Sequence, residues 1–191
     1  MRRLHEAGYP VPAVYEADGA DLVMEQLDGR DMLADLARRP WRLRRHARTL
    51  ADLHNRLHQI PARACWPDAA GTDGSVLHLD LHPGNVMLTS RGPVVIDWSN
   101  ARSGPGGADV AMAYILLSGS ELDDLPRYVR LAIGLVRGAF VRHFLHAVRD
   151  DPGPHIAPVA RDRMTDPNVR PSELIWLART AAEAEQGQLS R

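Results

Sequence analysis

The sequence predicts an α+β fold in which two short pairs of strands are combined with a helix-rich C-terminal part. Two apolar runs, residues 86–88 and 94–96, flank Thr-Ser-Arg-Gly-Pro and predict an antiparallel hairpin. A second pair of strands, residues 13–17 and 21–26, surrounds the turn signal Asp18-Gly19. Both pairs are short, and most of the remaining chain has a helical pattern.

The helical part rests on apolar residues that recur at intervals of three and four. Residues 29–62 carry one such apolar stripe, with Pro40 near its N-terminal end and His54 and His58 at its margin. Similar patterns over residues 125–148 and 171–185 predict two further helices. Gly- and Pro-containing segments at 65–75, 99–107 and 150–153 are expected to be loops or breaks.

The N-terminal residues predict a short helix that leads into an extended segment. Residues 2–8 end in Gly8, a helix stop signal, and Pro10 and Pro12 follow. The strand pair at 13–26 comes next, and a two-stranded sheet is marginal alone. We expect its unpaired edge to be covered by loops of the chain itself or by another subunit, for example in a homodimer.

Polar residues gather at the ends of the predicted central hairpin. Asp80 and Asn85 precede its first strand, and Asp97 directly follows its second strand. An antiparallel hairpin would bring these three side chains to one end of the ribbon. Mg²⁺ prefers oxygen ligands and takes one or two carboxylates from protein, while a remaining carboxylate can accept a proton from a hydroxyl. The pattern therefore fits phosphoryl transfer.

The residues around this hairpin resemble a known family. The segment HLDLHPGN, which contains His78, Asp80 and Asn85, is followed by IDW, which contains Asp97. This combination is similar to the catalytic and metal-binding loops of the aminoglycoside phosphotransferase and choline kinase group, which has a protein-kinase-like fold. The resemblance implies that Asp80 is the catalytic proton acceptor, that Asn85 and Asp97 bind Mg²⁺, and that His78 stabilises the loop by hydrogen bonding.

The same resemblance implies a nucleotide site and a division into two lobes. Residues 1–28 correspond to a remnant of the nucleotide-binding lobe and its hinge, and residues 29–191 to the helical lobe that carries the catalytic loops. Met24 would line the pocket, while the Glu25 carbonyl and the Leu27 amide would bond the adenine of ATP. A buried edge strand that runs into a turn is the alternative interpretation of this segment. The expected partners are the nucleotide and a small molecule with a hydroxyl acceptor.

The chain departs from the family pattern in one respect. It contains no Lys, whereas kinase-like folds use a strand Lys to hold the α and β phosphates, and no glycine-rich phosphate cover precedes residue 13. Arg differs from Lys in donor geometry. The resemblance is thus to an N-terminally truncated member, and a translation start upstream of Met1 is one explanation. An impaired module that binds ligands without transferring phosphate is the alternative to an active enzyme.

Two other sets of residues have alternative interpretations. His78, Asp80 and His82 alternate, so on a strand they would share one face and suit a transition-metal hydrolase. Asp109 would cap a helix that begins at residue 110, a contribution of about 1 kcal/mol. The family resemblance implies instead a buried carboxylate that accepts bonds from the catalytic-loop backbone. The acidic residues Glu121, Asp123 and Asp124 suit either a cationic acceptor or an ordinary helix start.

Composition argues against several other classes of protein. The formal net charge is −1, so no bulk charge favours nucleic acid or membrane surfaces. A single cysteine excludes an intramolecular disulfide, and no signal peptide or membrane span is expected. The Arg cluster at 38–48 is interpreted as the solvated face of a helix, with a nucleic-acid patch as the alternative. We therefore expect a cytoplasmic protein.

Overall fold

The computed structural model describes residues 1–19, 21–66, 74–119, 127–167 and 169–187. It has the mixed α and β content predicted from the sequence. The α-helices are α1 (Arg2–Glu6), α2 (Met32–Arg38), α3 (Leu43–Leu57), α4 (Ala62–Cys65), α5 (Gly106–Ser118), α6 (Arg127–Ala147), α7 (Gly153–Arg163) and α8 (Pro171–Glu185). The strands are β1 (Val14–Asp18), β2 (Asp21–Met24), β3 (Arg30–Asp31), β4 (Ser75–Leu77), β5 (Val86–Thr89), β6 (Gly92–Val95) and β7 (Arg102–Gly104), and two 3₁₀ turns are η1 (Pro40–Arg42) and η2 (Pro83–Asn85).

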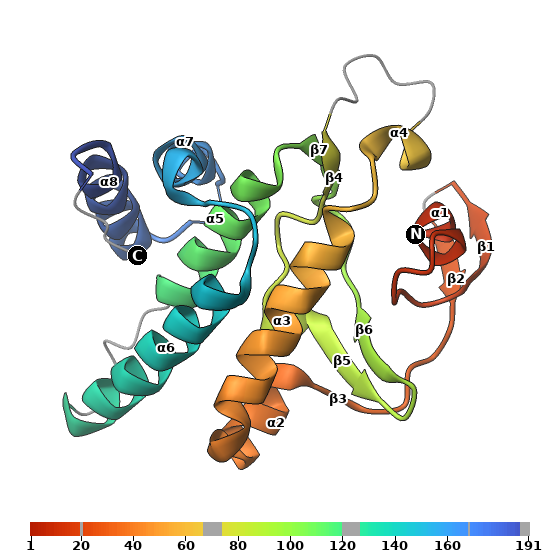
Figure 1. The fold of residues 1–191 in the computed structure, drawn as a ribbon, viewed down its shortest axis with the longest axis horizontal. Helices are drawn as coiled ribbons and strands as arrows, with labels where there is room; N and C mark the ends of the chain where they lie inside the picture. The colour runs from red at the N-terminus through yellow and green to blue at the C-terminus, as the bar shows by residue number, and fades with distance from the viewer. Residues whose placement is uncertain (20, 67–73, 120–126, 168, 188–191) are drawn as a thin grey trace.

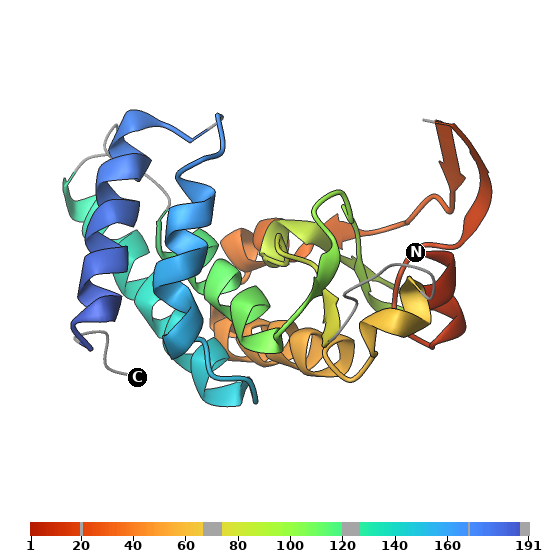
Figure 2. The ribbon, with the colours of Figure 1, turned by 90° about the horizontal axis from the view of Figure 1, so that it is seen from above.

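Helix α3 and the β5–β6 hairpin occupy the middle of the molecule. Figures 1 and 2 show the β1–β2 ribbon and α1 at one end, α7 and α8 at the other, and α3 with the β5–β6 hairpin between them. Helix α3 packs against α6, and α5 packs against α7, which pairs with α8. No helix in the described ranges has the length and apolar character needed to cross a membrane.

The central hairpin predicted from the two apolar runs is present. β5 and β6 are antiparallel, with Val86 opposite Val95 and Thr89 opposite Gly92. The short strand β3 adds to the other side of β5, which the sequence did not indicate because two residues carry no periodic pattern. Val86 and Val95 are buried, so the open end of the hairpin is fixed to the core.

The long helical pattern over 29–62 is divided in the structure. Helix α2 ends at Arg38, and Arg39 leaves helical geometry with φ −136° and ψ 66°. Pro40 then opens η1, because a residue without an N–H and with a fixed φ is tolerated only at a helix start. The apolar stripe on α3 is buried as expected, including Leu50 and Leu57.

The main core lies between α3, α6 and the hairpin. Leu50, Leu53 and Leu57 of α3 share it with Phe140 and Phe144 of α6. Tyr9 also belongs to this core, and its hydroxyl donates to the Leu53 carbonyl at 3.1 Å. A second cluster joins α5, α7 and α8, and contains Ile115, Ala157, Ala160, Leu177 and Ala181.

The N-terminal ribbon is present, but the chain does not cover it as expected. β1 and β2 form the predicted antiparallel pair, yet four of the five residues of β1 and all four of β2 are exposed. The expectation that the chain's own loops would shield this edge is therefore wrong for the described residues. Cover by another subunit stays a prediction.

Segments that were expected to be loops contain short strands and a short helix, and the strands pair although they are far apart in the sequence. β4 pairs with β7, so residues from the 65–75 and 99–107 segments lie side by side, and α4 occupies residues 62–65. Residues 67–73 lie outside the described ranges. Helix α7 begins at Gly153, inside the expected break, and was not predicted. α8 matches the predicted range 171–185, and α6 covers the described part of 125–148.

The helix that contains Asp109 begins earlier than expected. Its first residue is Gly106 and its N-cap is Pro105, so Asp109 lies within the first turn. The N-cap role for Asp109 is therefore wrong. Residues 104–107 consist of glycine and proline, which have low helix propensity, so the sequence did not indicate that a helix begins there. Packing places the helix start at these residues despite that propensity.

Asp35 of α2 is expected to make the free energy of unfolding fall in acid. Its buried carboxylate accepts hydrogen bonds from His46 at 2.9 Å, Arg39 at 2.6 Å and Arg42 at 3.3 Å. The His46 bond is the main reason that the pKa of Asp35 is lowered to about 2. Because the folded state binds this proton less readily than the unfolded chain, the stabilisation is complete above pH 3.8 and is lost as the pH falls through about 2.

Denaturant unfolding of wild type and Asp35→Asn from about pH 5 downward measures this contribution. We expect a shallower acid slope in Asp35→Asn. Identical slopes in the two proteins would show that Asp35 does not contribute.

Candidate functional site

The loop between β4 and β5 has a constrained backbone. Leu79 has φ +58°, an unusual value for a residue with a branched side chain. Farther along, His82 Nδ1 accepts the N–H of Gly84 at 3.1 Å, and a Cβ at Gly84 would lie 2.7 Å from the His82 ring. A larger residue at Gly84 would therefore have to displace the His82 ring at the bend that precedes Asn85.

His78 connects this loop to the strand on the far side of the hairpin. Its Nε2 donates to the Ile96 carbonyl at 3.0 Å, and its Nδ1 accepts the N–H of Asp80 at 3.2 Å. A ring that donates through one nitrogen and accepts through the other is neutral. Burial lowers the pKa of His78 and favours this neutral form. His78 therefore ties Asp80 to the residue before Asp97.

Asp80 and Asn85 are joined directly. The Asn85 amide nitrogen donates to the Asp80 carboxylate at 3.0 Å and to the Asp80 carbonyl at 2.8 Å. The Asp80 side chain is only partly buried, so one face of its carboxylate is accessible to solvent. The Asn85 amide oxygen, which can only accept, is left for a donor or a cation.

Asp97 lies at the same end of the hairpin. Ile96 donates its N–H to the Asn85 carbonyl at 3.0 Å, which makes Asp97 the next residue beyond the last cross-strand bond. Asp97 is exposed, has φ +60° and accepts the Ser99 hydroxyl at 2.8 Å. A non-glycine residue in the left-handed region costs of order 1 kcal/mol or more and is typical of functional sites.

The donor set at this end of the hairpin fits Mg²⁺. Asp97 offers a carboxylate to solvent, and Asn85 offers an amide oxygen because its nitrogen is turned toward Asp80. Mg²⁺ is commonly bound by one or two such protein oxygens, with the rest of its shell supplied by water and phosphates. Asn85 and Asp97 would hold the ion, and Asp80 would stay beside it.

The hydrolase alternative does not match the geometry. The positive φ of Leu79 breaks the alternation of His78, Asp80 and His82, so these residues are not on one strand face. Both ring nitrogens of His78 are engaged with backbone groups. His78 is therefore not available as a metal ligand.

Asp109 is buried directly behind the loop. Its Oδ1 accepts the N–H of Leu79 at 2.6 Å, and its Oδ2 lies 3.0 Å from His58 Nε2. Burial alone would raise the pKa of Asp109, but contacts with His54 and His58 outweigh burial and hold it well below its usual range. Asp109 thus accepts a bond from the residue next to Asp80.

His58 lies between two carboxylates. Its Nδ1 contacts Asp150 at 2.7 Å and its Nε2 contacts Asp109. Burial lowers the pKa of His58, yet the bonds and charges of Asp109 and Asp150 outweigh this and raise it. His54 is fully buried, and the side chain of His58 is 5% exposed. Both side chains are therefore buried, which corrects the expectation that they lie at the margin of the apolar stripe.

The residues of the expected hinge lie on or after the exposed ribbon. Met24 is 45% exposed and Leu27 is partly buried. The Glu25 carboxylate accepts from Arg91 at 2.6 Å and from the Ala13 N–H at 3.1 Å, which links the ribbon to the turn of the central hairpin. These contacts involve the Glu25 side chain, and the adenine roles of Met24, Glu25 and Leu27 stay predictions.

Two open cavities adjoin the site. One, of about 500 Å³, is lined by residues that include Leu22 of the ribbon and Trp98, which follows Asp97. The other, of about 210 Å³, is lined by His82 and Pro83 of the loop and by apolar side chains of α5 and α6, including Leu117 and Phe140. Residues 120–126, which hold the acidic candidates Glu121, Asp123 and Asp124, lie outside the described ranges.

Sequence reasoning missed Asp150 and misjudged His54 and His58. Asp150 is far from His58 in the chain, and its only local feature is a Pro-Gly break. His54 lies on the apolar stripe of α3 and His58 directly follows that helix, and their i, i+4 spacing was the available signal.

No curated protein matches the chain. Residues 62–154 match the phosphotransferase enzyme family, whose members use ATP and typically Mg²⁺. The matched segment includes the 78–85 loop, the hairpin, Asp97 and Asp109. The match over residues 62–154 confirms the resemblance drawn from the sequence for this part of the chain.

Proposed function

We propose that this chain is an ATP-dependent phosphotransferase that acts on a hydroxyl group of a small molecule. The observation that carries the proposal is the direct bonding of Asp80 to Asn85 at the end of the hairpin where Asp97 follows β6. In this proposal Asp80 orients the acceptor hydroxyl and takes its proton. Mg²⁺, held by Asn85 and Asp97, neutralises charge on the phosphates when it is bound.

The acceptor is proposed to approach through the smaller cavity. That cavity of about 210 Å³ includes His82 and Pro83, which are close in sequence to Asp80. Ligand sites of this kind combine an apolar lining with a few polar groups. The described lining is mostly apolar, which favours an acceptor with an apolar part next to its hydroxyl.

Residues 1–28 are proposed to be the remnant of a nucleotide-binding lobe, and residues 29–191 the helical lobe. The exposed ribbon supports this division, since a strand pair that is open to solvent is typical of a sheet whose other strands are absent. A second subunit that covers this edge is proposed as well. Its presence would appear as a dimer in analytical ultracentrifugation.

A second candidate function is a module that binds nucleotide or acceptor without transferring phosphate. The specific observation in its favour is the absence of Lys from the whole sequence. Kinases of the protein-kinase-like fold use a Lys to hold the α and β phosphates. Binding and transfer must therefore be measured separately.

Calorimetric titration of the full chain with Mg-ATP tests the nucleotide site. We expect saturable binding that Asp97→Ala weakens by roughly ten- to a hundredfold, since contacts to a charged group contribute about 1.5–3 kcal/mol. Asp52→Ala, which removes an exposed carboxylate on α3, is the matched control and should bind as wild type does. Absence of binding in wild type, or equal affinity in Asp97→Ala, would contradict the proposed site.

A further inference from the structure

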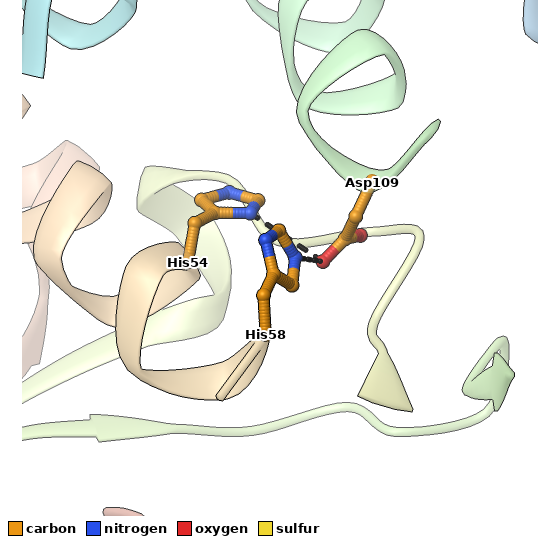
Figure 3. A group of neighbouring side chains, drawn as sticks. All are labelled: His54, His58 and Asp109. Atoms are coloured by element: carbon orange, nitrogen blue, oxygen red, sulfur yellow. Dashed lines mark hydrogen bonds and ion pairs between the residues drawn. The ribbon is translucent and has the colours of Figure 1, made fainter. Parts of the chain in front are cut away.

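Three side chains behind the catalytic loop converge on one point. Figure 3 shows His54 of α3, His58 directly after α3 and Asp109 of α5 directed toward one another. One ligand atom from each residue lies within 4.8 Å of the other two. Asp109 Oδ2 is 3.4 Å from His54 Nδ1 and 3.0 Å from His58 Nε2. Tetrahedral zinc with bonds of about 2.0–2.2 Å separates its ligand atoms by roughly 3.3–3.6 Å.

The protonation of His54 is fixed by its other nitrogen. Nε2 lies 3.3 Å from the Leu81 carbonyl, which can only accept, so Nε2 carries the hydrogen. Nδ1 has no hydrogen-bond partner among the described residues, although His54 is fully buried. In neutral His54 this nitrogen directs a lone pair at the Asp109 carboxylate. Two electron-rich atoms facing each other in a buried site call for a cation between them, which is either a proton on Nδ1 or a metal ion.

Charge balance leads to the same conclusion. Asp109 and Asp150 bring two negative charges to the cluster, and histidines that bind a metal do so as neutral imidazoles. A divalent ion bound by two neutral imidazoles and Asp109 brings the sum to zero. It would replace the proton on His58 Nε2 and leave Nδ1–H to Asp150.

The surroundings of each ligand are those of metal-binding residues. Metal-ligating histidines usually donate their second N–H to a carboxylate or a backbone carbonyl. His58 Nδ1 faces Asp150 at 2.7 Å, and His54 Nε2 faces the Leu81 carbonyl. The second oxygen of Asp109 accepts the Leu79 N–H at 2.6 Å. All three ligands are therefore oriented by a further bond.

We propose that His54 Nδ1, His58 Nε2 and Asp109 Oδ2 form a binding site for a divalent transition metal, with zinc the best chemical match. Imidazole with carboxylate suits zinc, whereas Mg²⁺ prefers an all-oxygen shell. This site is distinct from the one proposed at Asn85 and Asp97.

The ion would position the loop that carries Asp80. Two of its ligands bond the backbone on either side of that residue, Asp109 at Leu79 and His54 at Leu81. This positioning role rests on the proposed phosphotransferase function. The metal site itself does not, and metal binding can be measured without any activity.

The test is a titration of the chelator-treated full chain, made without a histidine tag, with Co²⁺ in excess Mg²⁺. Excess Mg²⁺ competes for the oxygen site proposed at Asn85 and Asp97. Co²⁺ with a low coordination number is recognised by its visible absorption. We expect one equivalent of Co²⁺ to bind with a strong visible band and to be displaced by Zn²⁺. His54→Leu should abolish this binding. His46→Leu, another buried histidine of α3, is the matched control and should retain it.

If His54→Leu does not fold, a second variant tests the proposed metal site. Asp150→Ala leaves all three ligands in place, and Asp150 is partly exposed, so the fold should persist. Loss of such an outer partner typically lowers metal affinity by about 10- to 100-fold. No Co²⁺ binding by wild type, unchanged binding in His54→Leu, or unweakened binding in a folded Asp150→Ala would each overturn the proposal. Metal binding without phosphotransfer would leave the metal site standing and refute only the proposed function.

Discussion

Replacing Asp80 with Ala is expected to lower the turnover number for phosphoryl transfer by about 10² to 10⁴, the usual contribution of a positioned proton acceptor. The Asp80 carboxylate is partly exposed and is oriented by Asn85 at 3.0 Å, while its backbone N–H is held by His78. Because these bonds fix its position, truncation should remove the proton acceptor without rebuilding the loop. Binding of Mg-ATP should change far less than turnover.

ATP turnover in the presence of small-molecule alcohols, aminoglycosides and choline among them, measures this effect. Asp52→Ala is a suitable control, because Asp52 is an exposed carboxylate on α3. Equal turnover in wild type and Asp80→Ala would remove Asp80 from the mechanism. Mg-ATP binding without turnover toward any acceptor would favour the binding-module interpretation.

The centre of the site could be predicted because its signals are local. The two apolar runs and the turn between them specify the β5–β6 hairpin, and its register brings Asn85 next to Ile96. The loop motif then assigns chemistry to residues a few positions away. Neither step required knowledge of how distant helices pack.

The parts that could not be predicted depend on long-range contacts. β4 pairs with β7 across residues 75–104, and His58 meets Asp150 across 92 positions, with no short-range pattern to indicate either pairing. The burial of His54 was also missed, since its polarity placed it at the margin of the stripe. In the structure its ring packs against Phe144 at 5.3 Å between centroids and its Nε2 donates to Leu81. Tertiary packing decided these positions.

The helix breaks show the same limit. A continuous apolar pattern over 29–62 predicts one helix, but Arg39 and Pro40 divide it and turn α2 away from α3. This division places Asp35 where it can meet His46. The position of Pro40 correctly indicated a helix start. The error was to treat the residues before Pro40 as part of the same helix.

Replacing Asp109 with Ala is expected to lower the free energy of unfolding by about 3–5 kcal/mol, the usual effect of removing one partner of a buried ion pair. Asp109 is 1% exposed and is bonded to His58, whose pKa is raised by the bonds and charges of Asp109 and Asp150 against the opposing effect of burial. The variant leaves Asp150, which is partly exposed, as the remaining carboxylate partner of His58 among the described residues. Leu79 also loses the acceptor that holds its N–H at φ +58°.

Denaturant unfolding with chelator present measures this loss without any contribution from bound metal. Asp162→Ala provides the matched control, because its pair with Arg102 is 4.0 Å long and exposed on both sides. Exposed pairs contribute about 0–1 kcal/mol, so that variant should unfold nearly as wild type does. A loss below about 1 kcal/mol in Asp109→Ala would mean that the buried charges are relieved in another way. Since domains of this size are stable by about 5–15 kcal/mol, the expected loss would take a large share of the total and loosen the loop that carries Asp80.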